Sequence, residues 1–156
     1  MMNKLTLSAL AFLCCAVLCC GCGGEKKPDG MPKLVPVSVT ITQGGAPLAE
    51  ALVSFYPSTE ANKQWSCGGA TDEQGVIKVM TLGKHEGMAP DTYKVTVMKT
   101  LIENPQINED DPPGQFYQLV DKKYMLENTT DLTITVTDEK NQTFTLDVGD
   151  AVKIPQ

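Results

Sequence analysis

The stretch Val37-Ser-Val-Thr-Ile-Thr-Gln-Gly-Gly-Ala-Pro-Leu-Ala-Glu-Ala-Leu-Val-Ser-Phe-Tyr-Pro57 decides the fold class of this 156-residue chain. Its apolar residues at positions 37, 39 and 41 alternate with serine and threonine, which is the period of a half-buried strand and not of a helix. Gly44-Gly45 then supplies a turn, because glycine tolerates positive φ angles. Ala51, Val53 and Phe55 resume the alternation until Pro57. The stretch predicts two strands that form a first pair.

The same period of two recurs along the rest of the chain. A third strand is expected near residues 65–71, and a turn at residues 72–75 leads to a fourth. A fifth follows, and two more flank a turn at residues 138–141. The residues expected to face inward in strands four to seven are Ile77, Val79, Tyr93, Val95, Val97, Leu132, Ile134, Val136, Phe144, Leu146 and Val148. Seven short strands without helical periodicity predict an all-β fold, a single seven-stranded antiparallel β-sandwich.

One connection is much longer than the others. Residues 101–130 hold Pro105, Pro112, Pro113 and Gly114, and connections of this length are functional or mobile when they carry no secondary structure. Within this connection, residues 116–124 are expected to form one helical turn whose aromatic side chains hold the loop against the sandwich. The loop is the expected site of binding, since loops carry function more often than the strands that they join.

The N-terminus has the pattern of an export signal. Lys4 is the only charge in residues 1–20, and the apolar run that follows it is too short to span a bilayer. Residues 1–21 are therefore assigned to a signal peptide. Residues 22–34 are assigned to a flexible tether, because residues 25–33 carry two prolines, a glycine and alternating charges, and residues 35–150 are assigned to the folded domain.

The cysteines near this signal indicate lipidation. Cys14, Cys15, Cys19, Cys20 and Cys22 lie in or just after the apolar run, so they are not the framework of a disulfide-rich domain. The segment Leu18-Cys-Cys-Gly-Cys-Gly-Gly24 resembles a bacterial lipobox, in which a small residue precedes the cysteine that receives a diacylglycerol thioether. Gly21-Cys22 matches best, and Cys20 is the competing acceptor. Lipidation at Cys22 would anchor the domain to a membrane.

Composition excludes several classes of function. All 13 basic residues are lysines and the net charge is −6, so nucleic acid is a poor partner. The single histidine, His85, excludes sites that need two imidazoles. These counts predict a protein that is not an enzyme and uses no cofactor.

Candidate site residues remain, each with an ordinary structural alternative. His85 with Glu86 or Asp91 could bind a metal or act as an acid or base, but a lone loop histidine is usually solvated. The run Glu109-Asp-Asp111 could attract Ca²⁺, but it lacks the spacing of a calcium loop. Solvated loops are expected in both cases, so no metal site is predicted.

Two further groups of side chains are candidates. Cys67 is the only thiol outside the N-terminal cluster, and a buried, inert cysteine is the expected state, with a reactive or intermolecularly paired thiol as the alternative. The aromatic residues could form a platform for stacking sugars if they converge on one face, and core packing is the alternative. They are Trp65, Tyr56, Tyr117 and Tyr124.

Three segments resemble the carboxypeptidase regulatory-like domain of bacterial envelope lipoproteins: residues 37–57, Gly69-Ala-Thr-Asp-Glu-Gln-Gly75 and Ala89-Pro-Asp-Thr-Tyr-Lys-Val-Thr-Val97. This resemblance implies a transthyretin-like β-sandwich, with the Ig-like Greek key order, and a non-catalytic accessory or binding role. Tyr93 is expected to pack its ring inside while its hydroxyl reaches the backbone. The family usually has glycine where this chain has Glu50 and Asp91.

Two functional hypotheses follow. The first is a lipid-anchored, non-enzymatic interaction or structural module of the cell envelope, facing the periplasm or the cell exterior, with an envelope protein as partner. The second is a carbohydrate-binding module at the cell surface that uses the aromatic and loop residues.

Overall fold

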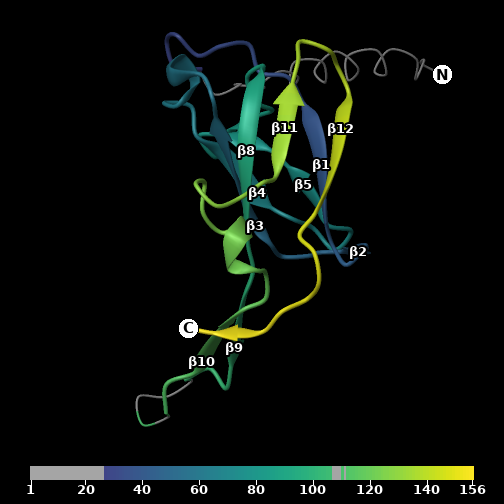
Figure 1. Ribbon diagram of the computed structural model, residues 1–156. Helices are drawn as coiled ribbons and strands as arrows, with labels where there is room; N and C mark the ends of the chain where they lie inside the picture. Colours follow the sequence, from purple (N-terminus) through teal and green to yellow (C-terminus); the bar gives the residue numbers. More distant parts are fainter. Residues whose placement is uncertain (1–26, 107–109, 111) are drawn as a thin grey trace, which may run out of the picture.

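The computed structural model describes residues 27–106, 110 and 112–156, and this part of the chain is all-β (Figure 1). The helical elements described are two single turns, η1 (Glu60–Asn62) and η2 (Lys122–Tyr124). The strands are β1 (Val37–Gln43), β2 (Ala46–Pro47), β3 (Leu52–Pro57), β4 (Cys67–Ala70), β5 (Val76–Lys78), β6 (Met80–Thr81), β7 (His85–Glu86), β8 (Asp91–Met98), β9 (Thr100–Glu103), β10 (Gln115–Gln118), β11 (Thr133–Val136), β12 (Gln142–Asp147) and β13 (Ile154–Pro155). The predicted all-β class is confirmed.

Each of the seven predicted strands has a counterpart in β1, β3, β4, β5, β8, β11 or β12. The described residues also contain six short strands that alternation did not indicate, so the count of seven is not confirmed. Three of them, β2, β6 and β7, have two residues each, which is too short for a period of two to be visible.

The first sheet is built around β1. In it β12, β1 and β2 lie side by side, and β5 also pairs with β1. The β1–β2 hairpin turns at Gly44 and Gly45, whose φ angles of 58° and 80° need glycine. β1 and β12 run parallel, with Val39 opposite Phe144. The prediction of antiparallel pairing throughout was therefore wrong for this pair, because the chain crosses from β11 to β12 through residues 137–141 at the end of the body where β1 also begins (Figure 1).

The second sheet contains six strands in the order β11, β8, β3, β4, β6 and β7, all paired antiparallel. β3 and β8 form its centre, and Val53 lies opposite Val97. The predicted first pair was wrong, since β3 belongs to this sheet and not to that of β1. The chain leaves the first sheet between Leu48 and Glu50. Leu48 is buried, and its amide donates to the Ile41 carbonyl. Glu50 has a φ of 53°, which redirects the backbone.

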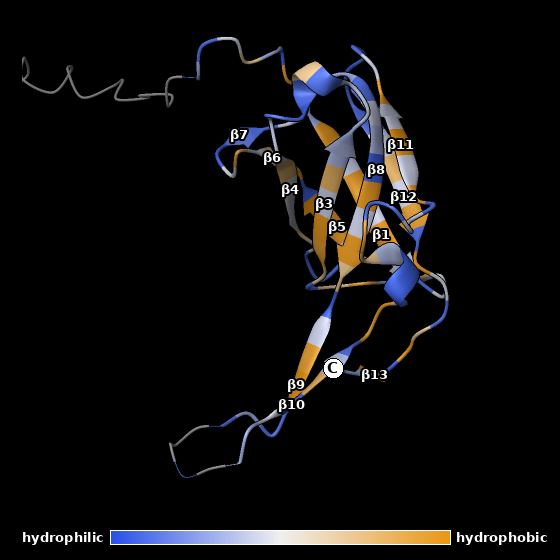
Figure 2. Ribbon diagram, turned by 60° about the vertical axis from the view of Figure 1, so that its left-hand side comes forward, coloured by the Kyte–Doolittle hydropathy of each residue, from blue (hydrophilic) through white to orange (hydrophobic). Residues whose placement is uncertain are grey.

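Both sheets contribute to one hydrophobic core. The predicted inward residues of β3, β5 and β8 are buried, as are Ile134, Val136 and Val148, and the apolar colour follows these strands in Figure 2. Leu132, Phe144 and Leu146 are partly buried against the core. Tyr93 packs edge-on against Phe55, with ring centroids 6.4 Å apart, and its hydroxyl donates to the Ala89 carbonyl at 2.7 Å. The expected placement of Tyr93 is confirmed.

The third sheet lies within and beside the predicted long loop. β9, β10 and β13 form a three-stranded antiparallel sheet that extends from one end of the body (Figure 1), and we call it the arm. The segment is therefore not a loop without structure. Residues 116–118 are strand and not helix, but η2 does form the expected helical turn, and Tyr124 at its end is buried in the core.

The two ends of the predicted domain, residues 35 and 150, can be located in the fold. Val35, the first residue of the predicted domain, is buried and bridges Met88. At the other end the fold extends past residue 150, because Ile154 and Pro155 pair with β10. The predicted signal peptide and Cys22 lie outside the described residues. Among the described residues, no helix is long and apolar enough to cross a membrane.

Candidate interaction surface

The predicted histidine site is not assembled. His85 lies in the short strand β7, partly exposed, opposite Thr81. Glu86 forms an ion pair with Lys78 at 2.9 Å, and Asp91 accepts hydrogen bonds from residues 58, 59 and 62. The described residues contain no group of three side chains suited to hold a metal ion.

Asp91 instead organises the turn after β3. The donors to its carboxylate are Asn62 (2.9 Å), Ser58 (2.7 Å), the Thr92 amide (2.7 Å) and the Thr59 amide (3.2 Å). Partial burial raises the pKa of Asp91, but these hydrogen bonds, with Asn62 the strongest, outweigh burial and bring the pKa down to about 2. The carboxylate is a structural anion whose acceptor positions are already used.

Most of the acidic run, residues 109–111, falls outside the described residues. Only Asp110 of the three residues is described, and it is exposed; Glu109 and Asp111 lie outside the described residues. No calcium site can be built from this single carboxylate.

Cys67 is buried on β4, as expected. Its thiol lies 3.9 Å from the Phe55 carbonyl, and burial raises its pKa to about 12. Because the thiolate is the reactive form, a thiol with this pKa is inert near neutral pH.

The four aromatic residues do not converge. Tyr124 is in the core and Tyr117 is on β10 in the arm, where the Lys153 ammonium lies 4.3 Å from its ring centre. Tyr56 on β3 and Trp65 after η1 flank the turn at the opposite end of the body. The four residues therefore do not form the platform that the sequence left open, and two partly exposed aromatic residues remain at one end.

A shallow hollow of about 330 Å³ lies beside β1 and β5. Its charged side chains are already engaged, since Lys78 pairs with Glu86 and Asp72 accepts hydrogen bonds from the Gln74 and Val76 amides at 3.0 and 2.8 Å. Apart from these charged residues, the polar side chain in the lining of the hollow is that of Ser38.

The surface that sequence patterns missed is the arm. Leu101, Ile102 and Phe116 are 37, 46 and 49 % exposed, and the arm is largely apolar in Figure 2. Ile102 lies opposite Phe116 on one face, and Leu101 lies opposite Tyr117 on the other. Contiguous exposed apolar surface is typical of sites where proteins interact, so the arm is the candidate surface. Neither Thr-Leu-Ile-Glu nor Gln-Phe-Tyr-Gln alternates polar with apolar, so the pattern gave no signal.

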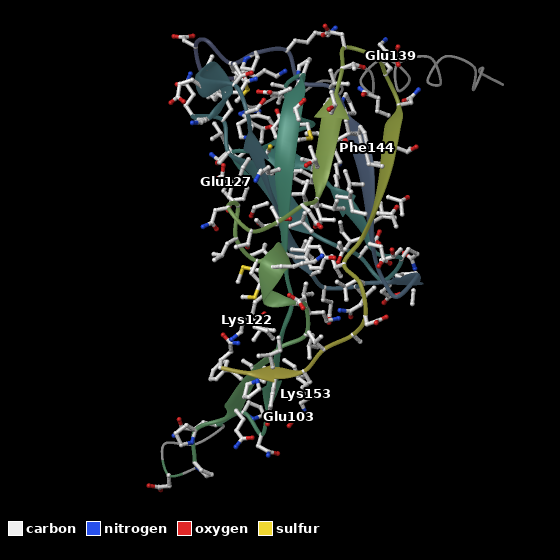
Figure 3. All side chains as sticks on the ribbon, viewed as in Figure 1. Glu103, Lys122, Glu127, Glu139, Phe144 and Lys153 are labelled. Carbon is white, nitrogen blue, oxygen red and sulfur yellow. The ribbon has the colours of Figure 1, made fainter. Side chains whose placement is uncertain are left out.

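Polar contacts fix the arm to the body. At its base the Gln43 side chain donates to the Leu119 carbonyl at 2.7 Å, and Lys99 donates to the Ala49 carbonyl at 2.7 Å. Within the arm Lys153 forms an ion pair with Glu103, and Figure 3 shows the two side chains together. These contacts hold the arm in a defined orientation.

Comparison with known proteins supplies no relative from which to transfer a function. No model of a protein family, no curated protein and no solved structure matches the chain. The function is therefore argued from the residues and from the geometry of the arm.

Proposed function

We propose that the protein is a lipid-anchored, non-enzymatic module of the bacterial cell envelope that binds a partner protein through its arm. The observation that carries the proposal is the arm itself, which presents Leu101, Ile102 and Phe116 to solvent on a small sheet held in place by the body. Burial of such side chains against a partner stabilises a complex by about 25 cal/mol per Å² of apolar surface.

For the fold, the proposal is a two-sheet sandwich of the carboxypeptidase regulatory-like kind. The shared core, the Tyr93 hydroxyl on the Ala89 carbonyl and the turn at residues 72–75 support it. Glu50 adds support, because its φ of 53° is a conformation that favours glycine, the residue that the family usually has there. The proposal keeps the two-sheet architecture and gives up antiparallel pairing of β1 with β12.

For the location, the proposal is membrane anchorage through a lipid on Cys22. Gly21-Cys22 after a short apolar run supports it. Each buried CH₂ of an acyl chain contributes about 0.8 kcal/mol, so a doubly acylated cysteine holds a protein stably on a membrane. In Figures 1 and 2 the described chain enters the body at the end opposite the arm. Anchorage at the N-terminus therefore leaves the arm at the far end of the domain, accessible to a partner.

Site-specific photocrosslinking in cells tests the binding role. A photoreactive amino acid replaces Phe116 on the arm in one variant and Leu52 on β3 in the other, because the two residues have similar exposed fractions of 49 and 55 %. We expect a crosslinked protein partner from position 116 and none from position 52. Capture from position 52 alone, or from neither position, would reject the arm as the binding surface.

A carbohydrate-binding role is the alternative, and one observation favours it. Tyr56 and Trp65 are both partly exposed and flank the same turn, so two rings remain that a sugar could stack on. Titration of the protein with a panel of envelope glycans, followed by Trp65 fluorescence, tests this role. Quenching that is lost in Tyr56→Ala would support it, and unchanged fluorescence across the panel would reject it.

A further inference from the structure

We infer that β9 is a self-complementary edge on which a second copy of this chain adds its own β9, antiparallel and centred on Leu101. The inference rests on the proposed binding role of the arm and names its partner. It follows from three features of the arm: the free edge of β9, the register that its backbone allows, and the side chains that this register brings together.

The backbone of β9 has one unpaired edge in the part of the chain that the structure describes. The sheet order is β13, β10, β9, so β9 pairs only with β10. The Leu119 amide donates to the Lys99 carbonyl at 2.8 Å, which makes Lys99 and Leu119 a hydrogen-bonded pair. Because such pairs alternate along an antiparallel ladder, Leu101 and Glu103 also bond toward β10. The amide and carbonyl of Thr100 and Ile102 therefore point to the free edge.

This alternation restricts how two copies of β9 can meet. A two-fold axis at Leu101 places Thr100 opposite Ile102 of the second copy, and both residues direct their backbone groups toward the new partner. Four backbone hydrogen bonds form, two on each side of the axis. An axis at Ile102 would instead place Thr100 opposite Asn104, which lies beyond the end of β9 and whose φ of 48° takes its backbone out of the extended conformation. The register centred on Leu101 is the one that uses the free groups fully.

In that register the side chains are complementary. Leu101 meets Leu101 of the second copy, and on the same face Lys99 lies opposite Glu103 at both ends of the pair. On the other face Thr100 lies beside Ile102 of the second copy, which continues the apolar row that Ile102 and Phe116 begin. Opposite charges and apolar pairs directly across an antiparallel ladder stabilise strand pairing.

Lys99 and Glu103 can each form this contact and keep their existing partners within the chain. Lys99 donates one hydrogen bond to the Ala49 carbonyl, and an ammonium group has three donors. Glu103 accepts from Lys153, and a carboxylate accepts at both oxygens. Neither bond within the chain has to break when the second copy binds.

The contact is small, so attachment to a membrane matters. Two strands of four residues bury less than the roughly 1,000 Å² expected of a stable interface. Confinement of both copies to one surface raises their effective concentration without new contacts. A weak, reversible pair is therefore expected on membranes, and covalent trapping is the suitable measurement.

Disulfide trapping tests the pair with the full chain in cell membranes. In the proposed register the two Leu101 residues form a non-hydrogen-bonded pair with Cα atoms about 4.5 Å apart, within the range of a disulfide. Under mild oxidation we expect Leu101→Cys to give a dimer joined through residue 101, identified by mass spectrometry of the linked peptide. Leu82→Cys is the matched control, since Leu82 has the same exposed fraction of 37 % and lies outside the arm. It should remain monomeric.

Two further experiments test the register. Co-expressed Thr100→Cys and Ile102→Cys chains should trap the mixed dimer more efficiently than either chain traps itself. Ile102→Pro removes an amide that points to the free edge and costs no bond to β10. Combined with Leu101→Cys, it should reduce trapping at least tenfold, while its melting temperature shows that the body remains folded.

The inference is overturned if Leu101→Cys dimerises no more than Leu82→Cys, or if Ile102→Pro leaves trapping unchanged. The proposed binding role fails separately. If residue 101 traps no second copy but photocrosslinking from position 116 still captures another protein, the arm remains the binding surface and only the identity of its partner is wrong.

Discussion

Side chains on opposite faces of β8 show how strongly the core constrains single residues. Val95 is fully buried, whereas the neighbouring Lys94 is exposed and donates to the Glu127 carbonyl at 3.1 Å. An unpaired carboxylate in place of Val95 would cost several kcal/mol, and small domains are stable by only about 5–15 kcal/mol. We predict that Val95→Asp abolishes cooperative unfolding in circular dichroism melts and that Lys94→Asp lowers the melting temperature by only a few degrees. Similar melts for both variants would contradict the assigned faces of β8.

Glu50 carries backbone strain at the point where the chain passes from one sheet to the other. Its φ of 53° lies in the left-handed region, which costs an L-residue other than glycine roughly 1–2 kcal/mol. We predict that Glu50→Gly leaves the free energy of unfolding unchanged or raises it by up to about 1 kcal/mol, because relief of strain offsets the greater entropy of the unfolded chain. Glu50→Val should lower it, since a branched side chain tolerates this region least. Urea titrations of the three proteins measure the order, and a more stable valine variant would contradict it.

Asp91 makes stability depend on pH in acid. Its pKa in the folded protein is about 2, below the value of about 3.9 expected when unfolded, so the unfolded chain binds the proton more readily. The stabilisation is therefore complete above about pH 4 and is lost as the pH falls toward about 2. We predict that Asp91→Asn is less stable than the natural protein at pH 6 and that the difference shrinks from pH 4 to pH 2. Asp131→Asn, which removes an exposed carboxylate, is the control. A difference that stays constant with pH would exclude the role of Asp91.

At the scale of elements, the alternation of side chains was predictable and the pairing of strands was not. Val53, Tyr93 and Ile134 face the core as their sequence pattern indicated, because the period of a strand is a local property. The partner of a strand depends on contacts distant in sequence. β1 pairs with β12, about a hundred residues away, and no local pattern encodes this choice.

The arm was missed for a related physical reason. Both of its faces are partly exposed, so β9 and β10 bury no single apolar face and their residues show no alternation. The prolines between them also resemble those of an irregular loop. The length of the segment predicted that it carries the function, and this stays a prediction. Which residues are presented to solvent required the structure.

The long connection between β9 and β10 is not expected to stabilise the body. Residues 104–114 join two strands that a two-residue turn can also join. We predict that replacing them with Asn-Gly changes the melting temperature by only a few degrees, since loop-closure entropy varies slowly with length. Glu103 and its ion pair with Lys153 are retained in this variant. A large fall in calorimetric melting temperature would show that the connection supports the core.

At the scale of the whole molecule, the N-terminal segment and the arm lie at opposite ends of the body. The tether enters at one end and the arm leaves from the other (Figure 1), with one core between them. Gln43 and Lys99 hold the arm on the body at the end away from the N-terminal segment. In the proposed function, this arrangement keeps the arm away from the lipid anchor and accessible to a partner.

Attachment at the N-terminal end depends on one sulfur atom in the proposed function. We predict that Cys22→Ser moves the protein from the membrane to the soluble fraction of cell lysates, because a serine hydroxyl cannot form the thioether that carries the acyl chains. Cys20→Ser is the matched control, since Cys20 lies two residues away and is the competing acceptor. It should leave the protein on the membrane, with the intact mass of a lipidated chain that begins at Cys22. If Cys20→Ser releases the protein instead, the acceptor is Cys20. If neither variant does, the intact mass of the Cys22→Ser protein decides between a lipid on Cys20 and an anchor other than a lipid on this cysteine cluster.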